Sequence, residues 1–236
     1  MSDTLDAATK PQGPPRADGQ RAVRPKNAAT MILVRRDGPQ PCVLMGRRNN
    51  RHTFMPGMWV FPGGRVDRAD HRVPAASELR PEVQAVFDAH LKPGLGRALA
   101  LAAVRETWEE AGLLMARQAP ARPGAGPWRE FLAQGAQADL AALDIVARAI
   151  TPPSVAKRFD TWFLMAEADR LISFERQPDC GELDEIAWVG FEEALDMKVP
   201  NVTRFVLSEA QARLAAPDRP RPYLKRGASN PQRAIL

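Results

Sequence analysis

Residues 97–113 read RALALAAVRETWEEAGL, and this stretch decides both the fold and the chemistry. The Ala- and Leu-rich run over residues 97–111 predicts a long helix, and Gly112 is the residue type expected just past a helix end. At about 100° per residue, four apolar side chains fall on one stripe of this helix: Leu101, Val104, Trp108 and Ala111. We expect this stripe to pack against the core of the protein.

Three acidic residues, Glu106, Glu109 and Glu110, share the other side of the predicted helix. Like charges four residues apart cost a helix about 0.2–0.5 kcal/mol per pair. Acids in a last turn also oppose the helix dipole, by about 0.3–1 kcal/mol each. The arrangement is therefore unfavourable for stability alone, whereas a divalent cation would reverse both penalties, since carboxylate oxygens are the ligands that Mg²⁺ and Mn²⁺ prefer. The helix predicts a metal site for Mg²⁺ or Mn²⁺.

The segments on either side of this helix predict a mixed α/β protein of the α+β type. Apolar runs at residues 28–36 and 42–48, split by DGPQP, predict a hairpin of two antiparallel strands. Further strands are predicted at residues 58–61, 113–117, 145–150, 159–166 and 186–189, and further helices at residues 81–90, 128–134, 191–196 and 202–214. Hairpins mixed with crossovers favour a mixed sheet sandwiched between helices over a doubly wound parallel sheet.

Composition sets the domain organisation. The formal charge of +5 lies at the ends, because residues 1–26 carry a net +2 and residues 217–236 a net +4. Basic, Pro-rich ends favour disordered tails at residues 1–26 and 216–236 around one domain at residues 27–215. No basic stripe with interleaved aromatic residues occurs, which makes nucleic acid an improbable partner. With no membrane-length apolar run and no secretory signal, we expect a cytoplasmic protein.

A known family accounts for these motifs together. Pro62-Gly63-Gly64 and the later RETWEEAGL at residues 105–113 resemble the two halves of the Nudix box, G-x5-E-x7-R-E-U-x-E-E-x-G-U, where U is apolar. Trp108 stands where the family usually has an aliphatic residue. In the family Arg105 would follow Gly64 by fourteen positions, whereas here it follows by 41, so 27 residues are inserted. We assign the insertion to residues 71–97, as a lid, a substrate-selecting flap or a dimer contact, which leaves a homodimer open.

The insertion leaves the first box glutamate without an evident equivalent. Asp70 holds its place by count from Gly64, with Asp67, Glu78 and Glu82 as rivals. In the family that residue mostly supports the box arginine. The resemblance does not decide among the four residues.

The resemblance implies a metal-dependent hydrolase acting on a nucleoside diphosphate linkage. Its metal ligands would be the backbone carbonyl of Gly63 and the side chains of Glu106, Glu109 and Glu110, one of which, or a loop glutamate, would act as base. Arg105 would orient the acidic residues. Glu182 lies where many family members place an extra acidic ligand.

Two further segments resemble the branch that contains the mammalian peroxisomal coenzyme A diphosphatases: FMPGMWVFPGG at residues 54–64 and TPPSVAKRFDTWFL at residues 151–164. The expected substrate is therefore coenzyme A or an acyl-coenzyme A. ADP-ribose, another nucleotide diphosphate, and a non-catalytic nucleotide-sensing module are the alternatives. Four arginines could grip phosphate in a bidentate manner: Arg47, Arg51, Arg65 and Arg158.

Overall fold

A central strand that is buried on both faces organises the fold. In the computed structural model, which describes residues 12–49, 56–176, 183–226 and 231–236, this strand is β1, Lys26–Arg35. Ala29, Met31 and Leu33 enter one hydrophobic cluster and Ile32 and Val34 enter another. Side chains alternate along a strand, so β1 separates two cores.

The main sheet has nine strands in the order β10-β2-β1-β9-β8-β11-β12, with β3 paired to β2 and β4 paired to β1. The β1–β9 and β8–β11 pairs are parallel and the remaining pairs are antiparallel. The sheet is therefore mixed, as the sequence predicts. Its other strands are β2 Cys42–Arg48, β3 Trp59–Val60, β4 Gly63–Arg65, β8 Asp144–Ile150, β9 Phe159–Glu167, β10 Leu183–Gly190, β11 Pro222–Arg226 and β12 Pro231–Ile235.

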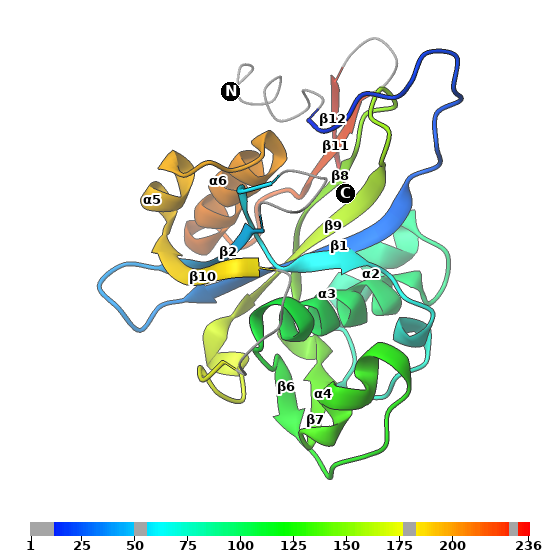
Figure 1. Cartoon of the computed structure of the whole chain (residues 1–236). Coiled ribbons are helices and arrows are strands. Elements are labelled where there is room, and N and C mark those ends of the chain that lie inside the picture. The colour runs from blue at the N-terminus through cyan, green and yellow to red at the C-terminus, as the bar shows by residue number, and fades with distance from the viewer. Residues whose placement is uncertain (1–11, 50–55, 177–182, 227–230) are drawn as a thin grey trace.

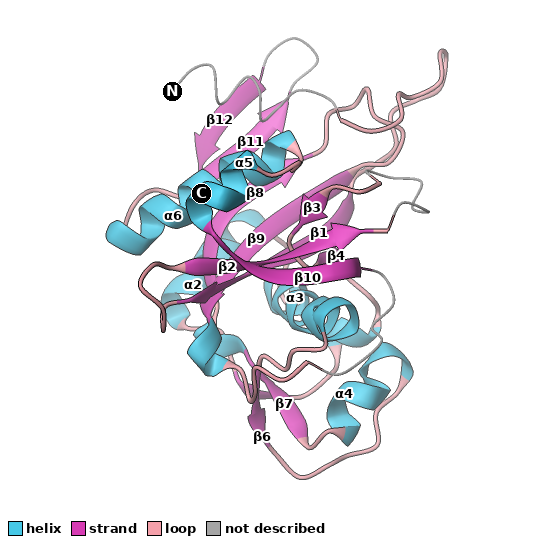
Figure 2. Ribbon diagram, turned by 60° about the vertical axis from the view of Figure 1, so that its left-hand side comes forward, coloured by secondary structure: helices cyan, strands magenta, loops and turns pink. Residues whose placement is uncertain are grey.

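Helices cover both faces of this sheet (Figures 1 and 2). α2 (Pro81–His90) and α3 (Leu95–Ala111) lie on one face, while α5 (Phe191–Asp196) and α6 (Asn201–Ala215) lie on the other. The predicted sandwich is confirmed. None of the helices in the described ranges combines the length and the apolar character needed to cross a lipid bilayer.

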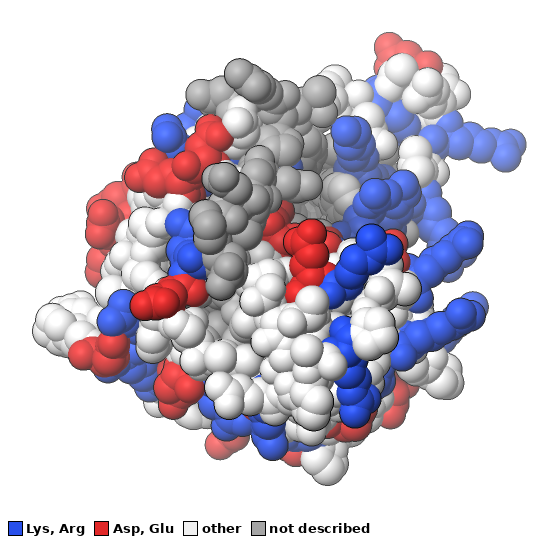
Figure 3. All heavy atoms as spheres, turned by 60° about the horizontal axis from the view of Figure 1, so that its bottom comes forward, with Lys and Arg blue, Asp and Glu red and all other residues white. Residues whose placement is uncertain are grey.

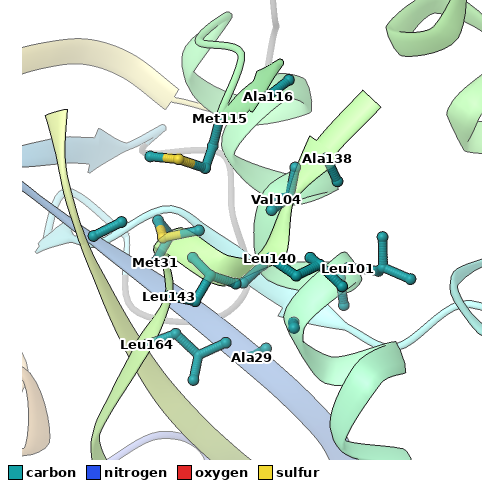
Figure 4. Close-up of a cluster of buried hydrophobic side chains, with 14 of the residues drawn as sticks. Ala29, Met31, Leu101, Val104, Met115, Ala116, Ala138, Leu140, Leu143 and Leu164 are labelled. Carbon is teal, nitrogen blue, oxygen red and sulfur yellow. The ribbon is translucent and has the colours of Figure 1, made fainter. Parts of the chain in front are cut away.

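α3 is the predicted long helix, and it begins two residues earlier than expected. Its predicted stripe is buried throughout: Leu101, Val104, Trp108 and Ala111. Leu101 and Val104 face Ala29 and Met31 of β1 in the core shown in Figure 4. Gly112 ends the helix with a φ of 67°, a left-handed conformation that suits glycine.

The insertion is part of the core. Val83 and Phe87 of α2 are fully buried, and Phe87 packs on Trp162 with ring centroids 4.7 Å apart. A Cβ atom on Gly96 would lie 2.5 Å from the Cβ of Phe87, so only glycine allows α2 to approach α3 this closely. A segment that supplies fully buried side chains to the core cannot move as a lid without exposing them.

A second, three-stranded sheet joins the insertion to the segment after α3. Its order is β5-β7-β6, formed by β5 Ala75–Ser77, β7 Ala136–Asp139 and β6 Ala116–Gln118, with α4 (Arg129–Ala133) beside it. Four short 3₁₀ helices complete the described chain: η1 Ala69–His71, η2 Gly126–Trp128, η3 Leu140–Ala142 and η4 Ala168–Arg170. This unit lies on the α3 side of the main sheet.

Several expectations need correction. The strand expected at residues 113–117 is β6, which covers residues 116–118, and the Gly-Gly segment begins strand β4, which was not among the expected strands. β5 and β7 were not expected. The main difference concerns the ends, which the composition assigned to disordered tails. Within residues 216–236, β11 pairs with β8 and buries Leu224.

The N-terminal segment also packs on the domain. The backbone of Pro15 forms a bridge with that of Val155, and Arg16 N donates to Ser154 O at 2.8 Å. Lys26, which the sequence assigned to the N-terminal tail, belongs to β1.

Lys and Arg side chains gather along one edge of the face shown in Figure 3, whereas acidic side chains are scattered over it.

Asp139 of β7 gives the small sheet a testable pH dependence. Its buried carboxylate accepts hydrogen bonds from Ser77 Oγ (2.5 Å) and Arg170 Nη2 (2.6 Å) and pairs with Arg117. Burial alone would raise the pKa of Asp139, but Ser77, Arg117 and Arg170 lower it below the ordinary value. Because the folded-state pKa is lowered, the stabilisation is complete above the ordinary aspartate pKa of about 3.9 and is lost as pH falls below it.

We therefore expect Asp139→Asn to lower the free energy of unfolding at pH 7 by about 1–3 kcal/mol. The difference from the unsubstituted protein should shrink in denaturant titrations repeated below pH 4. Asp37→Asn, which alters an exposed pair with Arg35, should change the free energy far less. A difference in the free energy of unfolding between Asp139→Asn and the unsubstituted protein that stays constant down to pH 3 would contradict the prediction.

Candidate active site

The candidate site lies where the last turns of α3 meet β4. In the ladder between β1 and β4, Ala29 lies opposite Gly64, and Thr30 lies opposite Gly63. Gly63 N donates to Glu110 Oε2 at 2.8 Å, and Arg65 O accepts from Arg105 Nη2 at 2.9 Å. The edge of β4 turned away from β1 is therefore the edge that contacts the polar face of α3.

The absence of a side chain at Gly64 lets the Glu106 carboxylate approach the backbone of β4. A Cβ atom there would lie 2.4 Å from Cδ of Glu106, which is far inside van der Waals contact. The carboxylate of Glu106 thus lies directly against the β4 backbone. The Gly-Gly segment and the acidic residues of α3 are adjacent in space, as the sequence predicts.

Arg105 is the centre of the hydrogen-bond network. Its guanidinium is almost fully buried, and each of its five N–H donors has a partner. Nε and Nη2 bind Asp70 at 3.0 and 3.2 Å, and Nη2 also binds Arg65 O. Nη1 binds Glu106 at 2.8 Å and Glu109 at 2.5 Å. Arg105 therefore fixes two of the three glutamates relative to β4.

The electrostatics follow from this geometry. Burial alone would lower the pKa of Arg105, but Asp70, Glu106 and Glu109 together raise it above its ordinary value. The guanidinium keeps its positive charge at every pH at which the protein is folded. It therefore offsets the repulsion among the acidic side chains of α3.

Asp70 occupies the position that sequence reasoning left open. It lies in η1 and is fully buried, and each of its oxygens accepts two hydrogen bonds. Oδ1 accepts from Arg105 Nε and from Trp128 Nε1 (2.8 Å), while Oδ2 accepts from Arg105 Nη2 and from Asp67 N (2.7 Å). Of the four rivals, Asp70 is the residue that holds Arg105.

The other three acidic candidates for this position make contacts away from Arg105. Asp67 Oδ1 caps the backbone at Ala69 N, at 2.8 Å. Glu78 pairs with Arg97, and Glu82 pairs with Arg80, and both glutamates have exposed side chains. The 27 inserted residues therefore follow Asp70 and leave the arginine–carboxylate contact intact.

Burial differs among the three glutamates of α3. Glu110 is 3% exposed, whereas the side chain of Glu109 is 35% exposed and that of Glu106 is 15% exposed. In the described ranges, no group of three acidic, histidine or cysteine side chains is drawn together closely enough to hold a metal ion. The carboxylates of Glu106 and Glu109 accept hydrogen bonds from Arg105 Nη1, and that of Glu110 accepts one from Gly63 N.

The expected phosphate-binding arginines lie at separate places. Arg65 follows Gly64 in β4 and is exposed, and its backbone carbonyl accepts a hydrogen bond from Arg105. Arg47 of β2 pairs with Glu185 of β10 at 3.2 Å. Arg158 donates to the backbone carbonyls of Thr151 (3.0 Å) and Val23 (2.8 Å), so it anchors the N-terminal segment. Arg51 and Glu182 lie outside the described residues.

Sequence reasoning missed Trp128. It placed this residue at the start of a helix over residues 128–134, without a role. The indole N–H reaches Asp70 across 58 positions of sequence. No local pattern signals such a contact.

Comparisons with known proteins agree with this geometry. The family model described as "NUDIX domain" matches residues 24–208, which is well over half of the chain. A NUDIX hydrolase from Alicyclobacillus acidocaldarius is 26% identical, with 82% of this chain and 97% of that chain covered and a TM-score of 0.59.

Two more distant structures are also similar. A MutT protein from Methanosarcina mazei Go1 is 18% identical, over 81% of this chain and 96% of that chain, with a TM-score of 0.46. The NUDIX domain of NrtR from Shewanella oneidensis, complexed with ADP ribose, is 14% identical over 81% and 90%, with a TM-score of 0.48.

Proposed function

Because this chain belongs to the Nudix family and is a Nudix hydrolase acting on nucleoside diphosphate-linked substrates, we propose that it cuts the diphosphate of coenzyme A or an acyl-coenzyme A. The hydrogen-bond network around Arg105 is the observation that supports hydrolysis at this site. It holds Glu106 and Glu109 beside the β4 backbone, to which Glu110 is bound directly. Three glutamates in the last two turns of one helix have no evident purpose in stability alone.

We propose Glu106, Glu109, Glu110 and the carbonyl of Gly63 as the groups that hold a divalent cation. Nudix hydrolases generally need such ions. The donor set fits by its chemistry, since Mg²⁺ and Mn²⁺ take carboxylate and carbonyl oxygens. In an antiparallel ladder the N–H and C=O of one residue point to the same side, so the Gly63 carbonyl should share the edge at which Gly63 N meets Glu110.

The ion, when bound, would activate water and neutralise charge on the phosphate oxygens. The protein contributes position and charge. One glutamate of α3 accepts the proton of the attacking water, whose oxygen bonds to one phosphorus while the bridging P–O bond breaks. Arg105 keeps the acidic residues oriented and does not itself contact substrate. The products from coenzyme A would be 3′,5′-ADP and phosphopantetheine, or its acylated form.

The choice of coenzyme A rests on residues 54–64 and 151–164, whose sequences resemble the coenzyme A branch. We propose Arg65 as the nearest phosphate contact, because it is exposed and directly follows Gly64. Arg47, Arg51 and Arg158 are proposed to contact phosphate further from the cleaved bond. A guanidinium can present a planar, bidentate donor pair to a phosphate, and for this Arg47 would exchange its pair with Glu185 and Arg158 its contacts with backbone carbonyls.

A substrate panel tests this proposal. The purified chain should be given coenzyme A, an acyl-coenzyme A, ADP-ribose and a dinucleoside polyphosphate, with Mg²⁺, with Mn²⁺ and with a chelator. We expect 3′,5′-ADP from the first two at the highest kcat/KM. Faster cleavage of ADP-ribose would overturn the coenzyme A assignment and leave the hydrolase intact.

Gly64→Ala should lower turnover, although it leaves Glu106, Glu109 and Glu110 unsubstituted. The added Cβ would force Glu106 away from β4, and a displacement of about 1 Å can cost up to a hundredfold in rate. We expect kcat to fall between about ten- and a hundredfold. Gly190→Ala is the matched control, since nothing lies within 4 Å of its added Cβ and its φ of −59° suits alanine. Equal rates in the two variants would contradict the steric argument.

A further inference from the structure

The inference concerns Trp128, a fully buried residue at the end of η2, which lies outside the box motif. Its Nε1 donates to Asp70 Oδ1 at 2.8 Å. The same oxygen accepts from Arg105 Nε at 3.0 Å. One carboxylate oxygen therefore joins the indole to the guanidinium that orients the acidic residues.

The indole is itself held in place by aromatic packing. Trp128 packs on Phe131 of α4 with ring centroids 4.9 Å apart and an interplanar angle of 75°. Phe131 in turn packs edge-on against Trp108 of α3, at 6.3 Å. The donor therefore has a fixed position relative to the helix that carries Arg105.

The chemistry of indole makes this contact directional. An indole nitrogen only donates, and it does not ionise in the range in which proteins fold. It therefore selects one orientation of the Asp70 carboxylate. Because Asp70 binds Arg105 through two nitrogens, the orientation of the carboxylate fixes the plane of the guanidinium. That plane sets where Nη1 meets Glu106 and Glu109.

We infer that Trp128 is a positioning residue for hydrolysis, acting through Asp70 and Arg105. The segment between α3 and β8 then has a function in catalysis, because it supplies the outermost link of the network. This inference rests on the proposed function, in which Glu106 and Glu109 hold the cation. The inference goes beyond the proposed function by assigning a role to a residue outside the box motif.

Trp128→Phe removes the donor and keeps an aromatic ring in the same place. Partners outside the ligand set typically contribute ten- to a hundredfold to metal affinity or activity, so we expect kcat to fall about tenfold. KM should change less than twofold, because Trp128 does not contact substrate. The dissociation constant of Mn²⁺ in the apo protein, measured by electron paramagnetic resonance, should rise about tenfold.

Phe191→Leu is the matched control. Phe191 of α5 is a buried aromatic residue on the other face of the main sheet, so its substitution weakens core packing but leaves the contacts of Trp128, Asp70 and Arg105 in place. We expect it to lower the melting temperature at least as much as Trp128→Phe, with kcat and Mn²⁺ affinity near those of the unsubstituted protein. If the two variants lose kcat in proportion to their loss of melting temperature, Trp128 is merely structural and the inference is overturned.

A double-substitution cycle tests the route of the effect. Arg105→Lys removes the two-nitrogen contact to Asp70, so adding Trp128→Phe in that background should change Mn²⁺ affinity less than twofold. A full tenfold effect in both backgrounds would overturn the route through Arg105. If the unsubstituted protein hydrolyses no diphosphate in the panel, the proposed function fails, and the Mn²⁺ affinities alone decide whether Trp128 positions the acidic residues.

Discussion

Asp70→Ala should destabilise the protein by about 3–5 kcal/mol, the range for removing one partner of a buried ion pair. Four hydrogen bonds are lost at once, those donated by Arg105 Nε, Arg105 Nη2, Trp128 Nε1 and Asp67 N. The remaining guanidinium is buried, so water cannot readily replace the carboxylate. Denaturant unfolding at pH 7 measures the change. We also expect metal-dependent turnover to fall, since Arg105 loses the contact that orients it.

Glu78→Ala is the control for this substitution. Glu78 lies in the inserted region, just after Asp70 in the chain, and also pairs with an arginine, Arg97, but its side chain is 62% exposed. Exposed ion pairs contribute little. If Glu78→Ala and Asp70→Ala cost the same free energy of unfolding, then Asp70 does not have the role that we assign to it.

Sequence patterns predict those helices and strands whose conformation is decided mainly by their own residues. The β1–β2 hairpin follows from two apolar runs and a Gly-Pro turn, and α2 and α5 have the predicted bounds. α3 follows from its Ala and Leu content and its terminal glycine. In each case the residues that decide the element lie within it.

β11 shows where such reasoning ends. The basic, Pro-rich composition of residues 216–236 indicates disorder, yet β11 pairs with β8, about 75 positions earlier along the chain. Tyr223 also stacks with Arg148 of β8, whose guanidinium lies 4.6 Å from the ring centroid. A strand that is stabilised by a distant neighbour has no signature in its own composition.

The candidate site also has some features that the sequence predicts and others that depend on distant contacts. The shared helix face of Glu106, Glu109 and Glu110 follows from helical periodicity, and their proximity to Gly63 and Gly64 follows from the family resemblance. The choice of Asp70 over Glu78 depends on burial, which a count of positions cannot supply. The part played by Trp128 depends on a tertiary contact with no local signal.

Glu109→Gln should lower metal-dependent turnover by more than about a hundredfold, since even residues outside a ligand set can contribute that much. The amide keeps the size of the side chain but removes the charge needed to hold a cation. Stability should change little, because Glu109 is the most exposed of the three glutamates and shares Arg105 Nη1 with Glu106. The rate with saturating Mg²⁺ or Mn²⁺, measured beside the melting temperature, distinguishes loss of function from loss of fold.

Glu82→Gln is the matched control for Glu109→Gln. It makes the same chemical change on another helix, at a side chain that is 62% exposed and also bound to an arginine. Its rate should equal that of the unsubstituted protein. Near-normal turnover in Glu109→Gln at saturating metal would show that turnover does not need the Glu109 carboxylate, and would contradict its assignment as a metal ligand.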